Sequence, residues 1–256
     1  MKIASWNVNS LRVRLPQVLD WLAAEQPDVL ALQETKIPDM QFPQAEIEAA
    51  GYRVIFSGQN TYNGVALISR EPAAGAALTD LPGLDDPQRR VLGARYGAIY
   101  VLNVYVPNGQ EAGSDKYAYK LSWLNRLQSF VEVQLQETPE LVLLGDFNIA
   151  PQECDVHDPA AWENSILFTQ PERAAFQRLL DAGLVDTFRL FEQAEKSYSW
   201  WDYRMLAFRR NRGLRIDHVL ASQALAKRCT SASIDKTPRA LERPSDHAPV
   251  IAEFTL

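Results

Sequence analysis

The stretch Leu141–Pro151 most limits what this chain can fold into, because it begins as a buried strand and ends abruptly. Its apolar residues 141–144 are typical of a strand inside a sheet, and Gly145 permits the sharp backbone change that ends it. Asp146 and Asn148 follow two positions apart, so an extended backbone would point both side chains to the same side. The carboxyl ends of strands are where α/β sheets hold ligands. Asp and Asn are also common turn formers, so this segment alone supports a turn and a site equally.

The composition is that of an ordinary globular protein. The chain has 256 residues, of which 46% are hydrophobic and 23% charged. No linker, repeat or low-complexity segment divides it, so we expect a single domain over residues 1–256. Met1–Asn7 carries no signal-peptide pattern, and no apolar run reaches the ~20 residues of a bilayer span, so no membrane partner is expected. Cys154 and Cys229 are not in a metal-type spacing, and so few cysteines favour a cytoplasmic location.

The order of strands and helices predicts two packed sheets. Lys2–Trp6 and Asp28–Gln33 are strand candidates on either side of an amphipathic helix that has Pro16 in its first turn. Such a unit favours parallel pairing with a right-handed crossover. Many strands with few helices between them then favour an α/β sandwich, two sheets face to face with helices outside. The other predicted elements are helices at Gln44–Ala50, Ser114–Gln136 and Pro171–Leu180, and strands at Tyr52–Phe56, Val65–Ser69, Val91–Tyr96, Ala98–Val104, Leu214–Ala221 and Pro249–Phe254.

Polar residues gather at or just beyond the ends of these predicted strands. Any one of them alone is more often a turn residue or a cap than a catalytic group. Several such segments from distant parts of the chain are harder to dismiss, because the strand ends of two packed sheets can meet along one rim. Only Asp217 falls inside its predicted strand. The residues are Asn7, Asn9, Glu34, Tyr105, Asn108, Asp146, Asn148, Asp217, Asp246 and His247.

The acids and amides of this set suit a hard divalent cation. Glu34, Asp146 and Asp246 offer oxygen donors that prefer Mg²⁺ or Mn²⁺ to zinc. The chain has only 3 histidines and no H-E-x-x-H pattern, which disfavours a histidine-based zinc site. Asp217 and His247 could pair as carboxylate and imidazole, although an isolated histidine before a strand is more often simply hydrogen-bonded. The carboxamides that would join the acids are Asn7, Asn9 and Asn148.

Other hydrolytic chemistries have less support. No G-x-S-x-G elbow is present, and neither cysteine has a flanking pattern that would activate it. A glycine-rich phosphate loop of the nucleotide-binding kind is also missing. The residue types therefore indicate metal-assisted hydrolysis of a phosphate ester by water.

An aromatic and basic segment bears on the substrate. Ser197–Arg204 is rich in aromatic residues, which can stack on bases, and the arginines after it can hold phosphates. By composition alone a hydrophobic strand followed by a solvated basic loop is the commoner explanation. The net charge of −6 also argues weakly against a nucleic-acid partner, although acids around a metal would contribute to it. The positive side chains are Arg209, Arg210, Arg212 and Arg215, with Arg89, Arg90, Lys116 and Lys120 as extensions.

Eight ordered motifs from the first strand to the last resemble the bacterial exonuclease III family, which belongs to the endonuclease/exonuclease/phosphatase superfamily. Because they span essentially the whole chain in the right order, the resemblance is highly specific. The motifs are Trp6-Asn7-Val8-Asn9-Ser10-Leu11-Arg12, Leu32-Gln33-Glu34-Thr35-Lys36, Asn63-Gly64-Val65-Ala66, Asn103 to Gly109, Gly145 to Pro151, Tyr198-Ser199-Trp200, Leu214-Arg215-Ile216-Asp217-His218 and Ser245 to Val250.

The resemblance implies a four-layer α/β sandwich of the DNase I-like kind and a monomeric, Mg²⁺-dependent repair nuclease for double-stranded DNA, with Mn²⁺ able to substitute. Such enzymes cut beside abasic sites, repair blocked 3′ ends and degrade DNA from 3′ ends. By match, Glu34 holds the metal, Asp146 handles the water and Trp200 lines the pocket for the baseless sugar. The wider sets are the metal-site residues Asn7, Asn9, Asp146, Asn148, Asp246 and His247, the catalytic residues Tyr105, Asn148, Asp217 and His247, and the DNA-binding residues Arg12, Asn108, Lys116, Arg204, Arg209 and Arg210.

The substrate leaves alternatives open. Residues 155–170 lie in a region that varies within the family, and Leu167 and Phe168 could form a wedge that favours exonuclease over abasic-site cleavage or could anchor the core. A phospholipid or inositol-phosphate phosphoesterase on the same fold is a remoter reading, which the aromatic and arginine-rich segment disfavours. A non-catalytic DNA-binding protein is disfavoured because the set of polar residues is complete.

Overall fold

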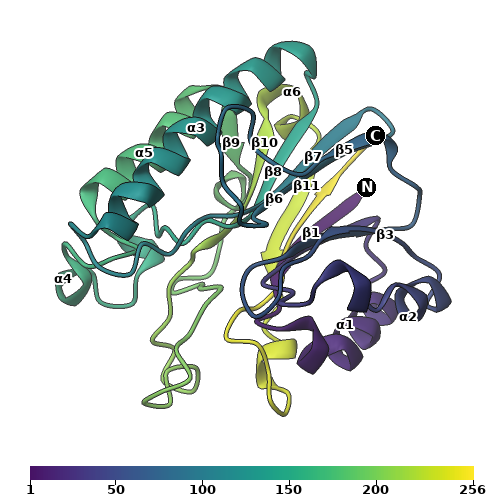
Figure 1. The fold of residues 1–256 in the computed structure, drawn as a ribbon. Helices are drawn as coiled ribbons and strands as arrows, with labels where there is room; N and C mark the ends of the chain where they lie inside the picture. The colour runs from purple at the N-terminus through teal and green to yellow at the C-terminus, as the bar shows by residue number, and fades with distance from the viewer.

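The computed structural model describes residues 1–256 as two six-stranded sheets packed face to face (Figure 1). Sheet one has the order β11-β12-β1-β2-β4-β3. Its strands are β1 (Lys2–Asn7), β2 (Val29–Gln33), β3 (Arg53–Ser57), β4 (Val65–Ser69), β11 (Cys229–Ile234) and β12 (Val250–Phe254). Sheet two has the order β5-β6-β7-β8-β10-β9. Its strands are β5 (Ala74–Leu78), β6 (Val91–Tyr96), β7 (Ile99–Tyr105), β8 (Leu141–Asp146), β9 (Leu184–Asp186) and β10 (Asp217–Ser222).

Helices cover the outer face of each sheet. In Figure 1, α1 and α2 lie against sheet one, and α3 and α5 lie on the opposite side against sheet two. The helices are α1 (Leu11–Glu25), α2 (Gln44–Ala49), α3 (Asp115–Glu137), α4 (Pro159–Trp162), α5 (Gln170–Asp181) and α6 (Gln223–Ala226), with 3-10 turns η1 (Asp39–Gln41), η2 (Glu153–Asp155), η3 (Thr187–Leu190) and η4 (Pro238–Ala240). The predicted four-layer α/β architecture is confirmed.

Side-chain alternation along the strands separates three apolar layers. In β8, Val142 and Leu144 point between the sheets, whereas Leu141 and Leu143 pack beneath α3 and α5. In β1, Ile3 joins the layer between the sheets and Trp6 joins the layer under α1. Strands buried on both faces need no polar residues along their length, so their polar side chains are concentrated near the ends.

The predicted strand-helix-strand unit is confirmed, because β1 and β2 pair in parallel around α1. Pro16, however, lies inside α1 rather than in its first turn, since the helix already begins at Leu11. Backbone hydrogen bonds from Ser10 and Leu11 to the segment after β2 fix that early start. Pro16 is exposed, so water can reach the carbonyl that its missing N–H leaves free.

One strand boundary and three whole strands differ from the sequence prediction. The strand expected at Leu214–Ala221 begins at Asp217, because Leu214 instead bridges Val156 and Trp200 outside the sheet. Asp217 therefore stands at the end of its strand and not within it. Three strands were also missed: β5 is mostly exposed Ala and Gly, β9 has 3 residues, and the edge strand β11 is rich in Ser and Thr.

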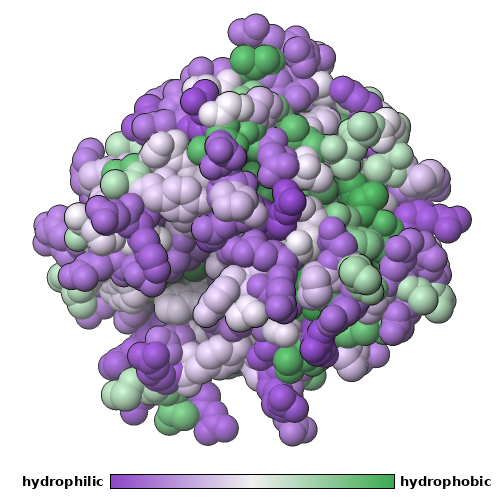
Figure 2. All heavy atoms as spheres, in the orientation of Figure 1, coloured by the Kyte–Doolittle hydropathy of each residue, from purple (hydrophilic) through white to green (hydrophobic).

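The surface is mainly hydrophilic in the view of Figure 2, where hydrophobic residues form scattered groups among the polar ones. No helix of the structure has the length and apolar character needed to cross a membrane. Two long loops, green and yellow at the bottom of Figure 1, project from one end of the sandwich. They lead into β10 and β12, and the predicted polar residues lie at this same end.

Candidate active site

Strand pairing brings the predicted polar residues to one rim. In the parallel pair β7 and β8, Tyr105 lies beside Asp146, and in the antiparallel pair β8 and β10, Asp146 lies opposite Asp217. In sheet one, Asn7 ends β1 beside the end of β2, so that Glu34 follows at the same edge. His247 precedes β12, which runs antiparallel to β1. The site is therefore assembled from both sheets, at the carboxyl ends of parallel strands and the amino ends of antiparallel neighbours.

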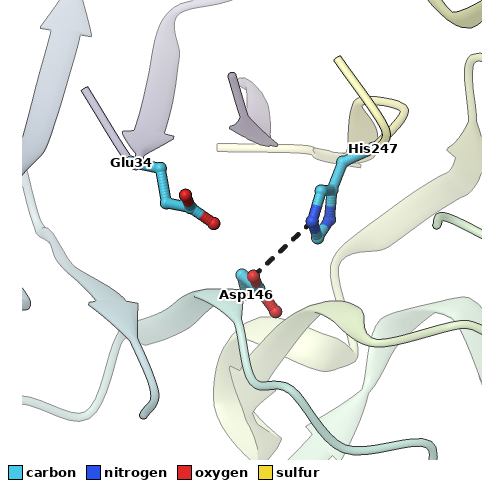
Figure 3. A group of neighbouring side chains, drawn as sticks. All are labelled: Glu34, Asp146 and His247. Carbon is cyan, nitrogen blue, oxygen red and sulfur yellow. Dashed lines mark ion pairs between the residues drawn. The ribbon is translucent and has the colours of Figure 1, made fainter. Parts of the chain in front are cut away.

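Three side chains form a cluster that could hold a metal ion. Potential ligand atoms of Glu34, Asp146 and His247 all lie within 4.8 Å of one another, and their side chains converge in Figure 3. The Nε2 atom of His247 is 3.8 Å from Oδ2 of Asp146. The Asn7 amide donates to both Glu34 Oε1 and Asp146 Oδ2, and each hydrogen bond is 2.8 Å long. Two carboxylates sharing one amide donor fit a hard divalent cation, which would offset their mutual repulsion.

Lys36 is a neighbour of this cluster that sequence reasoning did not single out. Its Nζ lies 2.8 Å from Oε2 of Glu34 and also donates to Asn9 Oδ1 in a hydrogen bond of 2.6 Å. Lys36 is the last residue of the Gln33-Glu34-Thr35-Lys36 motif, so its place two residues after Glu34 could have pointed to it. Lys36 thus supplies positive charge to Glu34 on the side away from Asn7.

A buried acid fixes the orientation of His247. The Nδ1 atom of His247 lies 2.9 Å from Oδ2 of Asp217, which also accepts the hydroxyl of Ser199 over 2.7 Å. Burial alone would lower the pKa of His247, but the carboxylates of Asp217 and Asp146 outweigh it and raise that pKa. The imidazole is therefore held as a cation with Nε2 pointed at Asp146. Ser199, which sequence reasoning quoted only within the Tyr198-Ser199-Trp200 motif, completes this arrangement.

The pKa values of Asp146 and Tyr105 are also raised. Burial raises the pKa of Asp146, with the nearby Asp217 and Glu34 charges adding to it, although His247 and the Asn7 amide act in the opposite direction. Burial also raises the pKa of Tyr105 well above its ordinary value, and the Glu34 and Asp146 charges reinforce the shift. The site thus concentrates negative charge in a place with little water, where a bound cation has the largest effect.

Asn148 has an unusual backbone held by its neighbours. Its φ of 51° lies in the left-handed region, and its backbone N–H donates to Asp146 Oδ1 over 2.9 Å. Its side-chain amide donates to the carbonyl of Val106 over 3.0 Å, and its Oδ1 accepts from Asn108 Nδ2 over 3.2 Å. The two predicted residues Asn148 and Asn108 therefore meet beside Asp146, and Asn108 is exposed to incoming ligands.

Asp246 lies beside the cluster rather than within it. Its Oδ1 accepts from Asn9 Nδ2 over 2.9 Å, and its Oδ2 accepts from the indole N–H of Trp200 over 3.0 Å. Burial would raise the pKa of Asp246, but His247 and these two donors together lower it. Asp246 therefore stays ionised and ties Trp200 to Asn9 at the edge of the site.

The predicted DNA-binding residues are mostly exposed, but three of the other basic residues named with them are not. Lys120 is fully buried and paired with Glu172, so it does not extend a positive surface. Arg215 is also buried, because Asp155 and Asp186 neutralise it. Arg90 packs over the ring of Tyr105 with little exposure. The residues that remain exposed are Arg12, Asn108, Lys116, Arg204, Arg209 and Arg210, while Trp200 is half-buried.

Leu167 and Phe168 are buried and pack with Ala150, Leu214 and Ile216, with the half-buried Trp200 against the same cluster. Of the two roles considered for them, the packing supports the core anchor. The cluster also packs against one side of Trp200.

Known proteins resemble this chain in sequence and in fold. The sequence model of the Endonuclease/Exonuclease/phosphatase family matches residues 4–247. Exodeoxyribonuclease III from Haemophilus influenzae is 38% identical to the chain over 266 residues, covering 99% of the chain and 100% of that protein. A solved structure of a 3′ phosphatase from Neisseria bound to a product DNA hairpin has a TM-score of 0.98 and 48% identity, with 100% of each chain covered. An AP endonuclease from Archaeoglobus fulgidus has a TM-score of 0.96 and 39% identity, again with 100% of each chain covered.

Proposed function

Because the chain belongs to the Endonuclease/Exonuclease/phosphatase family, we propose that it is a Mg²⁺-dependent DNA-repair nuclease that hydrolyses phosphate esters of double-stranded DNA at abasic sites and at 3′ ends. The observation that carries the proposal is the cluster of Glu34, Asp146 and His247, set against the buried Asp217. We further propose that the chain works as a single-domain monomer in the cytoplasm and accepts Mn²⁺ in place of Mg²⁺.

The metal has a defined part in this scheme. Glu34 and Asp146 would hold it, with Asn7, Asn9, Asn148, Asp246 and His247 in or near its shell, and the bound cation would stabilise negative charge growing on the phosphate. The donor set supports Mg²⁺, because carboxylate and amide oxygens are its preferred ligands.

The chain's own groups would divide the remaining work. Asp146 would orient the attacking water and accept its proton, a role suited to a carboxylate whose pKa is raised toward neutrality. His247, kept cationic by Asp217, would donate from Nε2 to a phosphate oxygen as charge develops there. Asn148 and Asn108 offer amide donors beside Asp146, and Tyr105 would contribute its hydroxyl at the same edge.

DNA would be held through its phosphates. The exposed cations Arg12, Lys116, Arg204, Arg209 and Arg210 supply charge without base recognition, so binding should show little sequence preference and strong salt dependence. Trp200, fixed by Asp246, would line the pocket for a sugar that lacks its base.

A second candidate is an enzyme in which 3′-end processing dominates and abasic-site cleavage is weak. One observation favours it: identity is 48% to the Neisseria 3′ phosphatase against 39% to the archaeal AP endonuclease.

One duplex can separate these candidates. It carries an internal abasic site on one labelled strand and a recessed, 3′-phosphorylated end on the other, and it is incubated with Mg²⁺, with Mn²⁺ or with chelator. We expect metal-dependent cleavage, and the ratio of internal to terminal products assigns the preference. Cleavage in chelator would overturn the mechanism. Release of phosphate from inositol phosphates without any action on the duplex would instead identify a phosphoesterase of another substrate class.

A further inference from the structure

One lysine of α3 is buried behind the loop that carries Asn148. The Lys120 side chain has 0% exposure, and its ammonium donates to the backbone carbonyl of Asn148 over 2.7 Å and to that of Asn108 over 3.1 Å. Its third partner is the carboxylate of Glu172, which is equally buried. An ammonium has three N–H donors, so every one of them has an acceptor here.

Glu172 extends the same network into a third segment. Its Oε1 accepts the backbone N–H of Leu167 over 3.1 Å, and its Oε2 accepts the N–H and the hydroxyl of Thr169 over 2.9 and 2.7 Å. The carbonyl of Leu167 in turn accepts the N–H of Ala150 over 2.7 Å. The Lys120–Glu172 pair therefore joins the loop after β7, the loop after β8 and the start of α5.

The loop after β7 is shaped to admit this lysine. Gly109 has a φ of +91°, and a Cβ placed on it would lie 3.1 Å from Cδ of Lys120 and 3.0 Å from Cδ1 of Ile166. The absence of a side chain at Gly109 thus leaves room for the stem of Lys120. If this region served only as apolar core, a leucine or methionine at position 120 would fill the same space without the desolvation cost of a buried charge.

We propose that Lys120 is a positioning residue for the reaction, and that it acts by holding the peptide carbonyls of Asn148 and Asn108 with Glu172 as its counter-ion. Asn148 has a left-handed backbone that needs external support, and its side chain meets Asp146 and Asn108. The ammonium fixes the Asn148 peptide from behind while the amide points into the site. Because the Lys120 side chain is fully buried, we expect its effect on the reaction to pass entirely through Asn148 and Asn108. This inference rests on the proposed function for the role of Asn148.

The test separates positioning from stability with two variants and a control. Lys120→Met removes the ammonium but retains most of the volume, and the double variant Lys120→Met/Glu172→Gln also removes the carboxylate left without a partner. Leu127→Ala is the control, because Leu127 is a buried residue of the same helix that packs under sheet two away from the loop. For each protein we would measure kcat and KM on the labelled duplex with Mg²⁺, Kd for that duplex in chelator, and Tm.

We expect Lys120→Met and the double variant to lower kcat by about 100-fold, the size of effect that small misplacements in a site produce, with KM and Kd unchanged. The double variant should regain much of the Tm that Lys120→Met loses, because it leaves no lone buried charge, yet it should not regain kcat. Leu127→Ala should lower Tm and leave kcat unchanged well below its melting temperature.

Three results would overturn the proposal: kcat within twofold of wild type in the double variant, recovery of kcat in parallel with Tm, or an equal loss of kcat in Leu127→Ala. If Lys120→Met does not fold, the double variant alone decides. Failure of the wild-type protein to cleave the duplex would instead refute the proposed function, so the two failures are distinguishable.

Discussion

The imidazole of His247 is bound through Nδ1 to Oδ2 of Asp217 over 2.9 Å, and this contact fixes which ring nitrogen faces the site. Asp217 occupies its position because it lies opposite Asp146 in the β8–β10 ladder. The strand register therefore places one acid behind the imidazole and another in front of it, where Nε2 lies 3.8 Å from Asp146. The two acids have different environments and, we expect, different roles.

Replacing Asp217 with asparagine should disable His247 while keeping the fold. The amide removes the charge that holds the imidazole cationic and can reverse its tautomer, so we expect kcat to fall by about 10²–10⁴-fold, the range for loss of a positioned acid or base. Steady-state cleavage of the duplex measures this effect, and circular dichroism checks the fold. Asp20→Asn, on the exposed side of α1, is the matched control. Wild-type kcat in Asp217→Asn would show that the pair is only structural.

Replacing Glu34 with glutamine should change the metal requirement more than the chemistry. The amide keeps an oxygen donor but removes one negative charge from the cluster, so the Mg²⁺ concentration for half-maximal activity should rise by at least about tenfold, as one lost ligand charge weakens the site. A Mg²⁺ titration of activity measures it, and Mn²⁺ binding followed by calorimetry gives a second readout. An unchanged titration midpoint would place the metal elsewhere.

Removing Arg209 or Arg210 should weaken DNA binding in a salt-dependent manner. Both side chains are exposed on the loop before β10. If each contacts one phosphate, its alanine variant should lower the slope of log Kd against log salt by about 1. Fluorescence anisotropy with a duplex in chelator gives that slope. Arg53→Ala is the control, because Arg53 is exposed at the far end of β3, and an equal change there would contradict a local DNA-binding surface.

Stability should decrease at mildly acidic pH because of His218. Burial, together with the adjacent Arg215, lowers the pKa of His218 from 6.5 to about 4. The unfolded chain then binds a proton that the folded chain rejects, so the contribution is complete above pH 6.5 and is lost as pH falls toward 4. By pH 5 the loss should reach about 2 kcal/mol. Urea unfolding at pH 7 and pH 5 measures it. His218→Gln should show a smaller pH dependence, and an identical slope in both proteins would refute this assignment.

Much of the rim could be predicted from sequence because its residues mark the ends of apolar runs. Leu141–Leu144 must be a buried strand, so Asp146 must follow at its end, and the same argument locates Asn7 and Glu34. Sequence pattern alone did not pair these ends in space. The order of whole-chain motifs supplied that step through the family resemblance.

What the pattern could not predict depends on contacts between distant residues. Lys120 was counted as surface charge, yet its partner Glu172 lies 52 positions away and takes it into the core. Arg215 was counted with the basic loop for the same reason, although Asp155 and Asp186 bury it. The net charge of −6 was likewise a poor guide to a DNA partner, since it sums acids in the site with arginines on the loops.

The position of β12 ties the placement of His247 to the pairing of β12 with β1. This last strand lies between β1 and β11 in sheet one, so the first and last strands of the protein are hydrogen-bonded neighbours. The segment that bears His247 leads directly into β12, so the pairing of β12 with β1 helps to fix its position. During synthesis, a chain that has produced Glu34, Asp146 and Asp217 still lacks the strand that closes the site. We therefore expect a chain cut short before β12 to cleave DNA far more slowly than the chain that contains it.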